Sequence, residues 1–172
     1  MTHYAVTAVG ADRPGIVAAL TGALYELDCN LEDVSSTILR GTFAVTLVVR
    51  AAEGLESGGL SRRVDEAVGA LGVSVSVREV DSQESRGEAT DVLIVYGSDR
   101  PGIVARVTRL LAERGANITD LSCRLTGAVY SMVAEVTLPD EVDRAALAEE
   151  IRGVGRDLGV DVTFRPVVVE TL

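Results

Sequence analysis

The seven-residue stretch DRPGIVA occurs twice in this chain of 172 residues, at residues 12–18 and again at residues 99–105. Isolated identities on both sides keep the same offset of 87 positions, among them Gly10 with Gly97 and Asn30 with Asn117. A constant register around seven consecutive identities is far beyond chance. Because two copies are too few for a solenoid, the sequence predicts a duplicated domain.

The domain boundaries follow from this repeat. Residues 81–88, DSQESRGE, are polar and show no hydrophobic periodicity, so we interpret them as a linker. The prediction is one domain over residues 1–80 and a second over residues 89–172.

Each copy predicts the same order of elements. Apolar residues alternate in the strands and recur with helical spacing in the helices. Pro14 and Pro101 are expected in a first helical turn, and Gly72 and Gly159 are expected to end the second helices. The expected strands are 4–9, 34–38, 43–49 and 73–77, matched by 91–96, 121–125, 130–138 and 160–164.

The order β-α-β-β-α-β predicts an α+β class with two ferredoxin-like domains. Each domain would be a four-stranded antiparallel sheet with two helices on one face. The crossover rule makes the first strand central and the last strand an edge, in agreement with Pro166 near the end of the last strand. The second strand is then the other edge, and we expect a like edge to cover it.

Composition excludes several classes of enzyme. All 16 basic residues are Arg, so the chain lacks the Lys of pyridoxal enzymes and of phosphate-binding loops. One histidine, His3, and two cysteines, Cys29 and Cys123, cannot assemble the common structural zinc sites. We therefore expect no metal and no cofactor.

Net charge and hydropathy limit the partners. The formal net charge is -10, and Arg62-Arg63 is the longest basic run, so direct binding to nucleic acid is not expected. The sequence shows neither a signal peptide nor a membrane span, so we expect a cytoplasmic protein without membrane contact. In that compartment Cys29 and Cys123 would be reduced and serve as small buried side chains.

The repeated stretch has the chemistry of a small zwitterion site. Backbone N–H groups at a helix N-terminus, approached closely at Gly15 or Gly102, suit a carboxylate. Asp12 or Asp99 offers the opposite charge to an ammonium group, and the amides of Asn30 and Asn117 can donate and accept hydrogen bonds. The structural alternative is that the aspartate is an N-cap, Pro-Gly a helix start and the asparagine a turn residue.

The pattern GxDRPGIVA after a first strand, followed by an asparagine some fifteen residues later, resembles the ACT-domain family of amino-acid-sensing regulatory modules. Both halves look like ACT domains, and a tandem of this size is most similar to the glycine cleavage system transcriptional repressor group. The resemblance implies that a small amino acid binds between two ACT domains. It implies one site of Asp12, Arg13, Pro14, Gly15 and Ile16 with Asn117, and another of Asp99, Arg100, Pro101, Gly102 and Ile103 with Asn30.

Three functions remain open from the sequence. The first is a non-catalytic regulatory protein, a homodimer that binds a small amino acid and signals through protein contacts. If it controls transcription of glycine metabolism, its acidic surface predicts a regulator protein as the partner. The alternatives are a structural adaptor without ligand, or an enzyme that pairs the carboxylates of Asp33 and Asp120.

Overall fold

The computed structural model describes residues 2–81 and 89–167 and divides the chain into two compact units. All of the expected linker except Asp81 lies outside the described residues. The first unit contains β1 (His3–Ala11), α1 (Ile16–Glu26), β2 (Asn30–Leu39), β3 (Thr42–Arg50), α2 (Ser57–Val68), a 3-10 turn (Gly69–Leu71) and β4 (Val73–Val80). The second contains β5 (Asp91–Ser98), α3 (Ile103–Glu113), β6 (Asn117–Thr126), β7 (Val129–Thr137), α4 (Arg144–Leu158) and β8 (Val160–Pro166).

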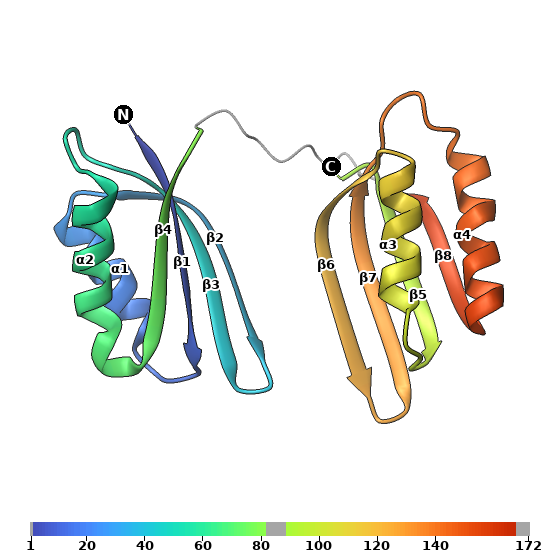
Figure 1. The fold of residues 1–172 in the computed structure, drawn as a ribbon, viewed down its shortest axis with the longest axis horizontal. Coiled ribbons are helices and arrows are strands. Elements are labelled where there is room, and N and C mark those ends of the chain that lie inside the picture. The colour runs from blue at the N-terminus through green and yellow to red at the C-terminus, as the bar shows by residue number, and fades with distance from the viewer. Residues whose placement is uncertain (1, 82–88, 168–172) are drawn as a thin grey trace, which may run out of the picture. The chain divides into compact units, whose positions relative to one another are not determined.

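Each unit is a four-stranded antiparallel sheet with its two helices on one face (Figure 1). The strand order is β2-β3-β1-β4 in the first unit and β6-β7-β5-β8 in the second. The first strand of each unit is therefore central and the last is an edge. The predicted α+β, ferredoxin-like class is confirmed.

The core of each unit lies between the sheet and the two helices. Alternate residues of a strand point to the same face, so Val6 and Leu47 bury their side chains against Leu20 of α1 and Leu60 of α2. The second unit repeats this with its own cluster, which includes Leu93, Val107, Met132 and Ile151. The same alternation of apolar residues therefore builds a separate core in each unit.

The first helix of each unit begins later than the sequence predicts. Gly15 and Gly102 both have a φ of 96° and form the N-caps, so α1 begins at Ile16 and α3 at Ile103. A positive φ cannot continue a right-handed helix, which leaves Pro14 and Pro101 in the preceding turn. The other ends agree with expectation, because Gly72 and Gly159 are left-handed C-caps.

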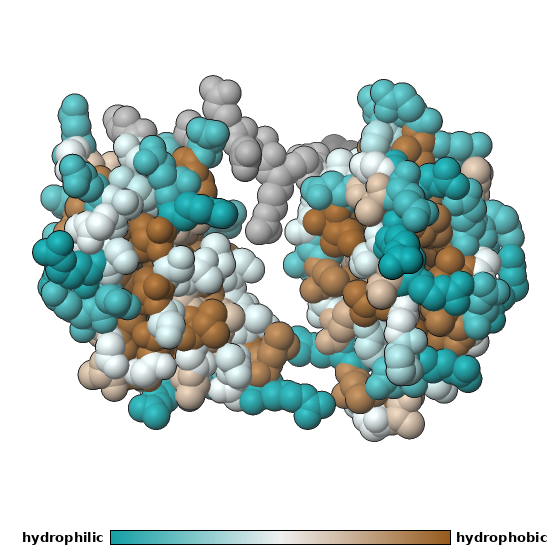
Figure 2. Space-filling view, viewed as in Figure 1, coloured by the Kyte–Doolittle hydropathy of each residue, from teal (hydrophilic) through white to brown (hydrophobic). Residues whose placement is uncertain are grey.

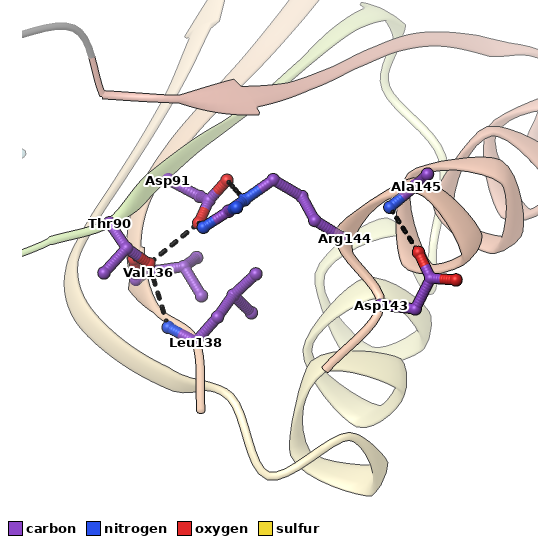
Figure 3. Close-up of polar contacts among 7 residues, drawn as sticks. All are labelled: Thr90, Asp91, Val136, Leu138, Asp143, Arg144 and Ala145. Carbon is purple, nitrogen blue, oxygen red and sulfur yellow. Dashed lines mark hydrogen bonds and ion pairs between the residues drawn. The ribbon is translucent and has the colours of Figure 1, made fainter. Parts of the chain in front are cut away.

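An ion pair between a buried carboxylate and a half-exposed arginine anchors α4 in the second unit (Figure 3). The Asp91 carboxylate, fully buried at the start of β5, accepts hydrogen bonds from Arg144 Nε at 2.7 Å and Nη2 at 3.1 Å. Thr90 Oγ1 donates a third bond to the same carboxylate at 2.8 Å. The repeat places Tyr4 at the position of Asp91, and its hydroxyl donates to the Leu55 carbonyl at 3.0 Å instead.

The edge strands β2 and β6 extend beyond the cover of the helices. Their cross-strand register places Val34 and Ile38 on the helix side of the first sheet, and Leu121 and Leu125 on the helix side of the second. All four remain between 42% and 52% exposed. Figure 2 shows apolar surface over β6 in the second unit. These strands present both apolar side chains and an unpaired backbone edge.

Candidate functional site

The repeated stretch forms the loop between the first strand and the first helix of each unit. Asp12 through Gly15 are all exposed, and so are Asp99 through Gly102. The backbone N–H of Asp12 donates to the Gly41 carbonyl at 2.8 Å, which ties this loop to the β2–β3 turn. Among the described residues, the carboxylates of Asp12 and Asp99 accept no hydrogen bond and form no ion pair. Both carboxylates are therefore available to a cationic group.

The helix N-termini at these loops carry no side-chain cap. The carbonyl oxygens of Gly15 and Gly102 accept the first helical bonds, from Ala19 N and Arg106 N, both at 2.9 Å. Both N-caps are glycines, which have no side chain to accept from the first turn, so the predicted alternative of an aspartate N-cap does not apply. At α4, by contrast, Asp143 Oδ1 accepts from two backbone N–H groups of the first turn, at 2.9 and 3.1 Å.

Space is available above both glycine caps. A Cβ placed on Gly15 or on Gly102 would meet no atom within 4 Å. With uncapped N–H donors directly behind, each loop offers a small open surface where an anionic group can reach the backbone. The two glycine caps provide this surface with the same φ of 96° and with similar ψ angles of -11° and -5°.

The side chains predicted to bind ligand have different roles in the structure. Ile16 and Ile103 are each 2% exposed and pack into the cores, so they can offer only backbone groups to a ligand. The Arg100 guanidinium lies beside Gly159 at the end of α4. A Cβ placed on Gly159 would be 3.6 Å from Arg100 Cζ. In the first unit, a Cβ placed on the equivalent Gly72 would meet no atom within 4 Å, so Arg13 does not take the position that Arg100 takes.

The asparagines lie at the other end of the sheet from the loop of their own unit. Asn30 pairs with Arg50, which pairs with His3 at the start of β1, whereas the loop follows Ala11 at the end of β1. Eight residues of extended strand span roughly 26 Å. Asn117 is placed in the same way, opposite Thr137 at the start of β6. One small molecule therefore cannot contact a loop and the asparagine of the same unit.

The second unit adds a polar side chain that the sequence analysis missed. Tyr130 pairs with Gly97 directly before the loop, on the same face as Cys123. The pKa of Tyr130 lies well above its ordinary value. Partial burial is the largest cause, and a hydrogen bond with Cys123 and the nearby charge of Asp99 add to it. The first unit has the buried Phe43 at this position. The replacement of Phe43 by Tyr130 between the two copies is the sequence signal that could have identified this side chain.

Two hollows lie away from the loops. One of about 260 Å³ lies between Arg114 and the start of α4, and one of about 290 Å³ lies over Ala5, Thr7, Ser76 and Arg78. Within residues 2–81 and 89–167, no three His, Cys, Asp or Glu side chains gather where they could hold a metal ion. In the same residues no helix has the length and apolar character needed to cross a bilayer.

Comparison with protein families assigns both units. An ACT domain model matches residues 3–78, and a second ACT domain model matches residues 92–156. The chain belongs to the ACT domain family. These matches confirm the resemblance that the repeated stretch carries, and they establish a tandem of two ACT domains.

Relatives extend this assignment. A UPF0237 protein from Methanopyrus kandleri is 43% identical over 82 residues, which are 47% of this chain and 91% of that protein. The matched half therefore belongs to the UPF0237 family, whose name states no activity. An unknown protein from Galdieria sulphuraria has a crystal structure with a TM-score of 0.82 and 28% identity, covering 97% of this chain and 99% of that one.

A candidate glycine cleavage system transcriptional repressor has a related structure. Its TM-score is 0.68 at 18% identity, covering 96% of this chain and 97% of that chain. At this identity the likeness shows the fold. Together, the family matches imply a regulatory role that involves a small ligand.

Proposed function

We propose that this protein is a non-catalytic sensor in which a small amino acid binds at the Asp12–Gly15 and Asp99–Gly102 loops. The observation that carries the proposal is the pair of exposed, uncapped helix N-termini, each preceded by an unpaired aspartate. The N–H groups suit the ligand's carboxylate and the aspartate suits its ammonium group. Both charges of a free amino acid are then matched within one loop.

An asparagine from another ACT domain completes each site in this proposal. A loop and the asparagine of its own unit lie at opposite ends of one sheet, which supports a contribution from a second domain. If two edge strands align antiparallel, the start of one lies beside the end of the other, and the asparagine comes level with the loop. The predicted pairs are Asp12 with Asn117 and Asp99 with Asn30, and we retain them as hypotheses.

Signalling would proceed through protein contacts. A ligand held by two domains favours the arrangement in which both contribute, and this differential affinity shifts the population of assemblies. We propose a homodimer and, for transcriptional control of glycine metabolism, a regulator protein as the target. The net charge of -10 supports protein contacts over direct contact with nucleic acid.

Calorimetric titration of the full chain with each of the twenty amino acids tests the proposal. We expect saturable heat from one small amino acid, with the heat lost in Asn30→Ala and Asn117→Ala. The control is Glu66→Ala on the exposed side of α2, which should leave the heat unchanged. No heat from any amino acid, with both units folded, would overturn the sensor and favour the structural adaptor.

A further inference from the structure

The sheet of the second unit has one face that its helices do not cover. Leu93, Val95 and Met132 point into the core, so their neighbours along β5 and β7 point the other way. We call this surface the open face of the second sheet. Its members where the two central strands pair are Val92, Ile94, Tyr96, Ser98, Val129, Ser131, Val133 and Glu135.

The middle of this open face is apolar. Ile94 pairs directly with Val133, and Tyr96 lies two residues further along β5. Tyr96 is 54% exposed and Val133 42%, and Val129, which is 37% exposed, extends the apolar surface beyond the row of Tyr96. Contiguous exposed apolar side chains on a flat strand surface are typical of a contact surface.

Four charged residues stand at the corners of the same face. Asp120 and Arg124 lie on β6, and Arg165 and Asp161 lie on β8. The register places Asp120 in one row with Arg165, through Glu135 and Val92. It places Arg124 in another row with Asp161, through Ser131 and Tyr96.

The corner charges alternate in sign around the apolar centre. Four residues of strand separate the corners along β6 and β8, roughly 13 Å, and three strand spacings separate them across the sheet, roughly 14 Å. Among the described residues none of the four has an ion-pair partner. The face therefore has two positive and two negative corners around an apolar centre, and a fifth charge, Glu135, lies beside Asp120 in one of the two rows.

Such a pattern is complementary to itself. A two-fold axis along the strands lays β8 of one copy over β6 of the other, which brings Arg165 over Asp120 and Asp161 over Arg124. An axis across the strands again sets opposite charges over each other, Asp120 on Arg124 and Arg165 on Asp161. Either operation buries the apolar centres together at the spacing of stacked sheets, about 10 Å.

We propose that the open face of the second sheet docks onto the same face of a second copy of this chain. The occupant is identified by charge complementarity, because a face with alternating corners matches its own copy at all four positions. This contact is independent of amino-acid binding, since none of its residues belongs to the proposed ligand loops.

The first sheet shows that the pattern is not a general consequence of the fold. Its equivalent corners are Asp33, Thr37, Arg78 and Ser74, so two of the four charges are missing. Its centre carries hydroxyl groups in place of apolar side chains. Thr7 and Thr46 occupy the positions of Ile94 and Val133, and their Oγ1 atoms lie 3.4 Å apart in a hydrogen bond. The open face of the first sheet therefore serves as the control surface for experiments on the open face of the second sheet.

Sedimentation velocity of the full chain over a range of concentrations tests the contact. Asp161→Arg sets like charges against a facing arginine in either arrangement, and we expect the association constant to fall at least about tenfold. The largest species should then have half its former mass. The matched control, Ser74→Arg at the equivalent position of the first sheet, should leave the mass unchanged. Equal behaviour of the two variants would overturn the proposal.

Inverting all four corners provides a second test. The variant with Asp120→Arg, Arg124→Asp, Asp161→Arg and Arg165→Asp has the same alternating pattern with opposite signs. We expect it to self-associate like the original chain but not to mix with it, as measured with one protein fluorescently labelled. Loss of self-association in the folded variant, or free mixing of the two proteins, would refute the contact.

Discussion

The two ACT domains of this chain share their strand order and the conformation of the glycine cap, and they differ in their side-chain anchors. Gly15 and Gly102 share a φ of 96°, and both edge strands β2 and β6 carry a register shift near their start. The buried Asp91, however, replaces Tyr4, and the apolar centre of the second open face replaces a row of hydroxyls. Loop geometry is therefore common to the two domains, whereas their anchors and their open faces differ.

Helix packing differs between the units in the same way. Gly155 of α4 lies so close to β8 that a Cβ there would be 2.5 Å from Val162 Cγ2 and 3.0 Å from the Val160 carbonyl. The equivalent residue of α2 is Val68, which is fully buried. The first unit therefore uses a valine side chain to fill the space that the second unit closes by bringing the helix nearer.

The largest effect expected from this comparison is that of Gly155→Val. The valine that fits in α2 has no room in α4, so we expect a loss of about 3 kcal/mol in the free energy of unfolding of the second unit. Hydrogen exchange of β8 peptides in the full chain measures that loss. Gly153→Val on the same helix, whose Cβ would meet only the end of Arg156 at 3.7 Å, is the control. Equal losses in both variants would refute the close packing.

Removing the ion pair of the second unit should have the next largest effect. Arg144→Met leaves the fully buried Asp91 carboxylate with Thr90 as its remaining side-chain donor, and we expect a loss of about 2 kcal/mol. The half-exposed arginine keeps this below the usual range for a fully buried pair. Urea unfolding followed by circular dichroism measures the change.

The control for this prediction is Arg152→Met. Arg152 pairs with Glu149 on the exposed side of α4, and its loss should leave the free energy of unfolding nearly unchanged, because solvent screens an exposed pair. A similar effect of both substitutions would show that burial of Asp91 does not matter. The double variant Asp91→Asn with Arg144→Met should recover part of the loss, because it removes the unpaired buried charge.

The shared glycine caps should respond equally in the two units. Gly15→Ala and Gly102→Ala introduce no clash but force a left-handed residue, which is expected to cost about 1 kcal/mol in each unit. Hydrogen exchange of α1 and α3 peptides measures the effect. Gly22→Ala, in the interior of α1 with open space around it, should instead stabilise the helix. Unequal losses at the two caps would contradict the shared loop geometry.

The smallest expected effect concerns Cys29, which is replaced by Ala116 in the second unit. Burial, partly offset by a backbone hydrogen bond from Ala52, raises the pKa of the Cys29 thiol. The reactive thiolate should therefore form at higher pH in the folded chain than in urea, and the stabilising neutral thiol is lost as pH rises through the folded pKa. Alkylation rates of the Cys29 peptide by mass spectrometry give both midpoints. Coincident midpoints would contradict the burial.

Much of the fold could be predicted from local patterns. The alternation around Val45 and Leu47 and the helical spacing through Leu60 and Val64 identify strands and helices without any tertiary information. The start of α1 could not be placed as well, because Pro14 fits a first helical turn by propensity. The left-handed Gly15 that delays the helix is a backbone conformation, which residue type permits but does not dictate.

The candidate site was predictable in part. The repeated stretch identified both loops, and the structure shows them exposed and uncapped. Sequence spacing could not reveal that Asn30 lies at the far end of its own sheet, because that follows from the pairing of β2 with β3. Nor could it reveal that Arg100 lies against Gly159, or that Tyr130 lies beside the loop on the face of Cys123.

The sequence by itself determined the duplication, the order of the elements and the chemistry of the repeated loops, because these depend on residues close together along the chain. Only the tertiary structure decided which side chains share a face. The four alternating charges of β6 and β8 are far apart in sequence and meet on one surface through strand register. Register is a property of the folded sheet, where a shift of one residue would send each side chain to the opposite face.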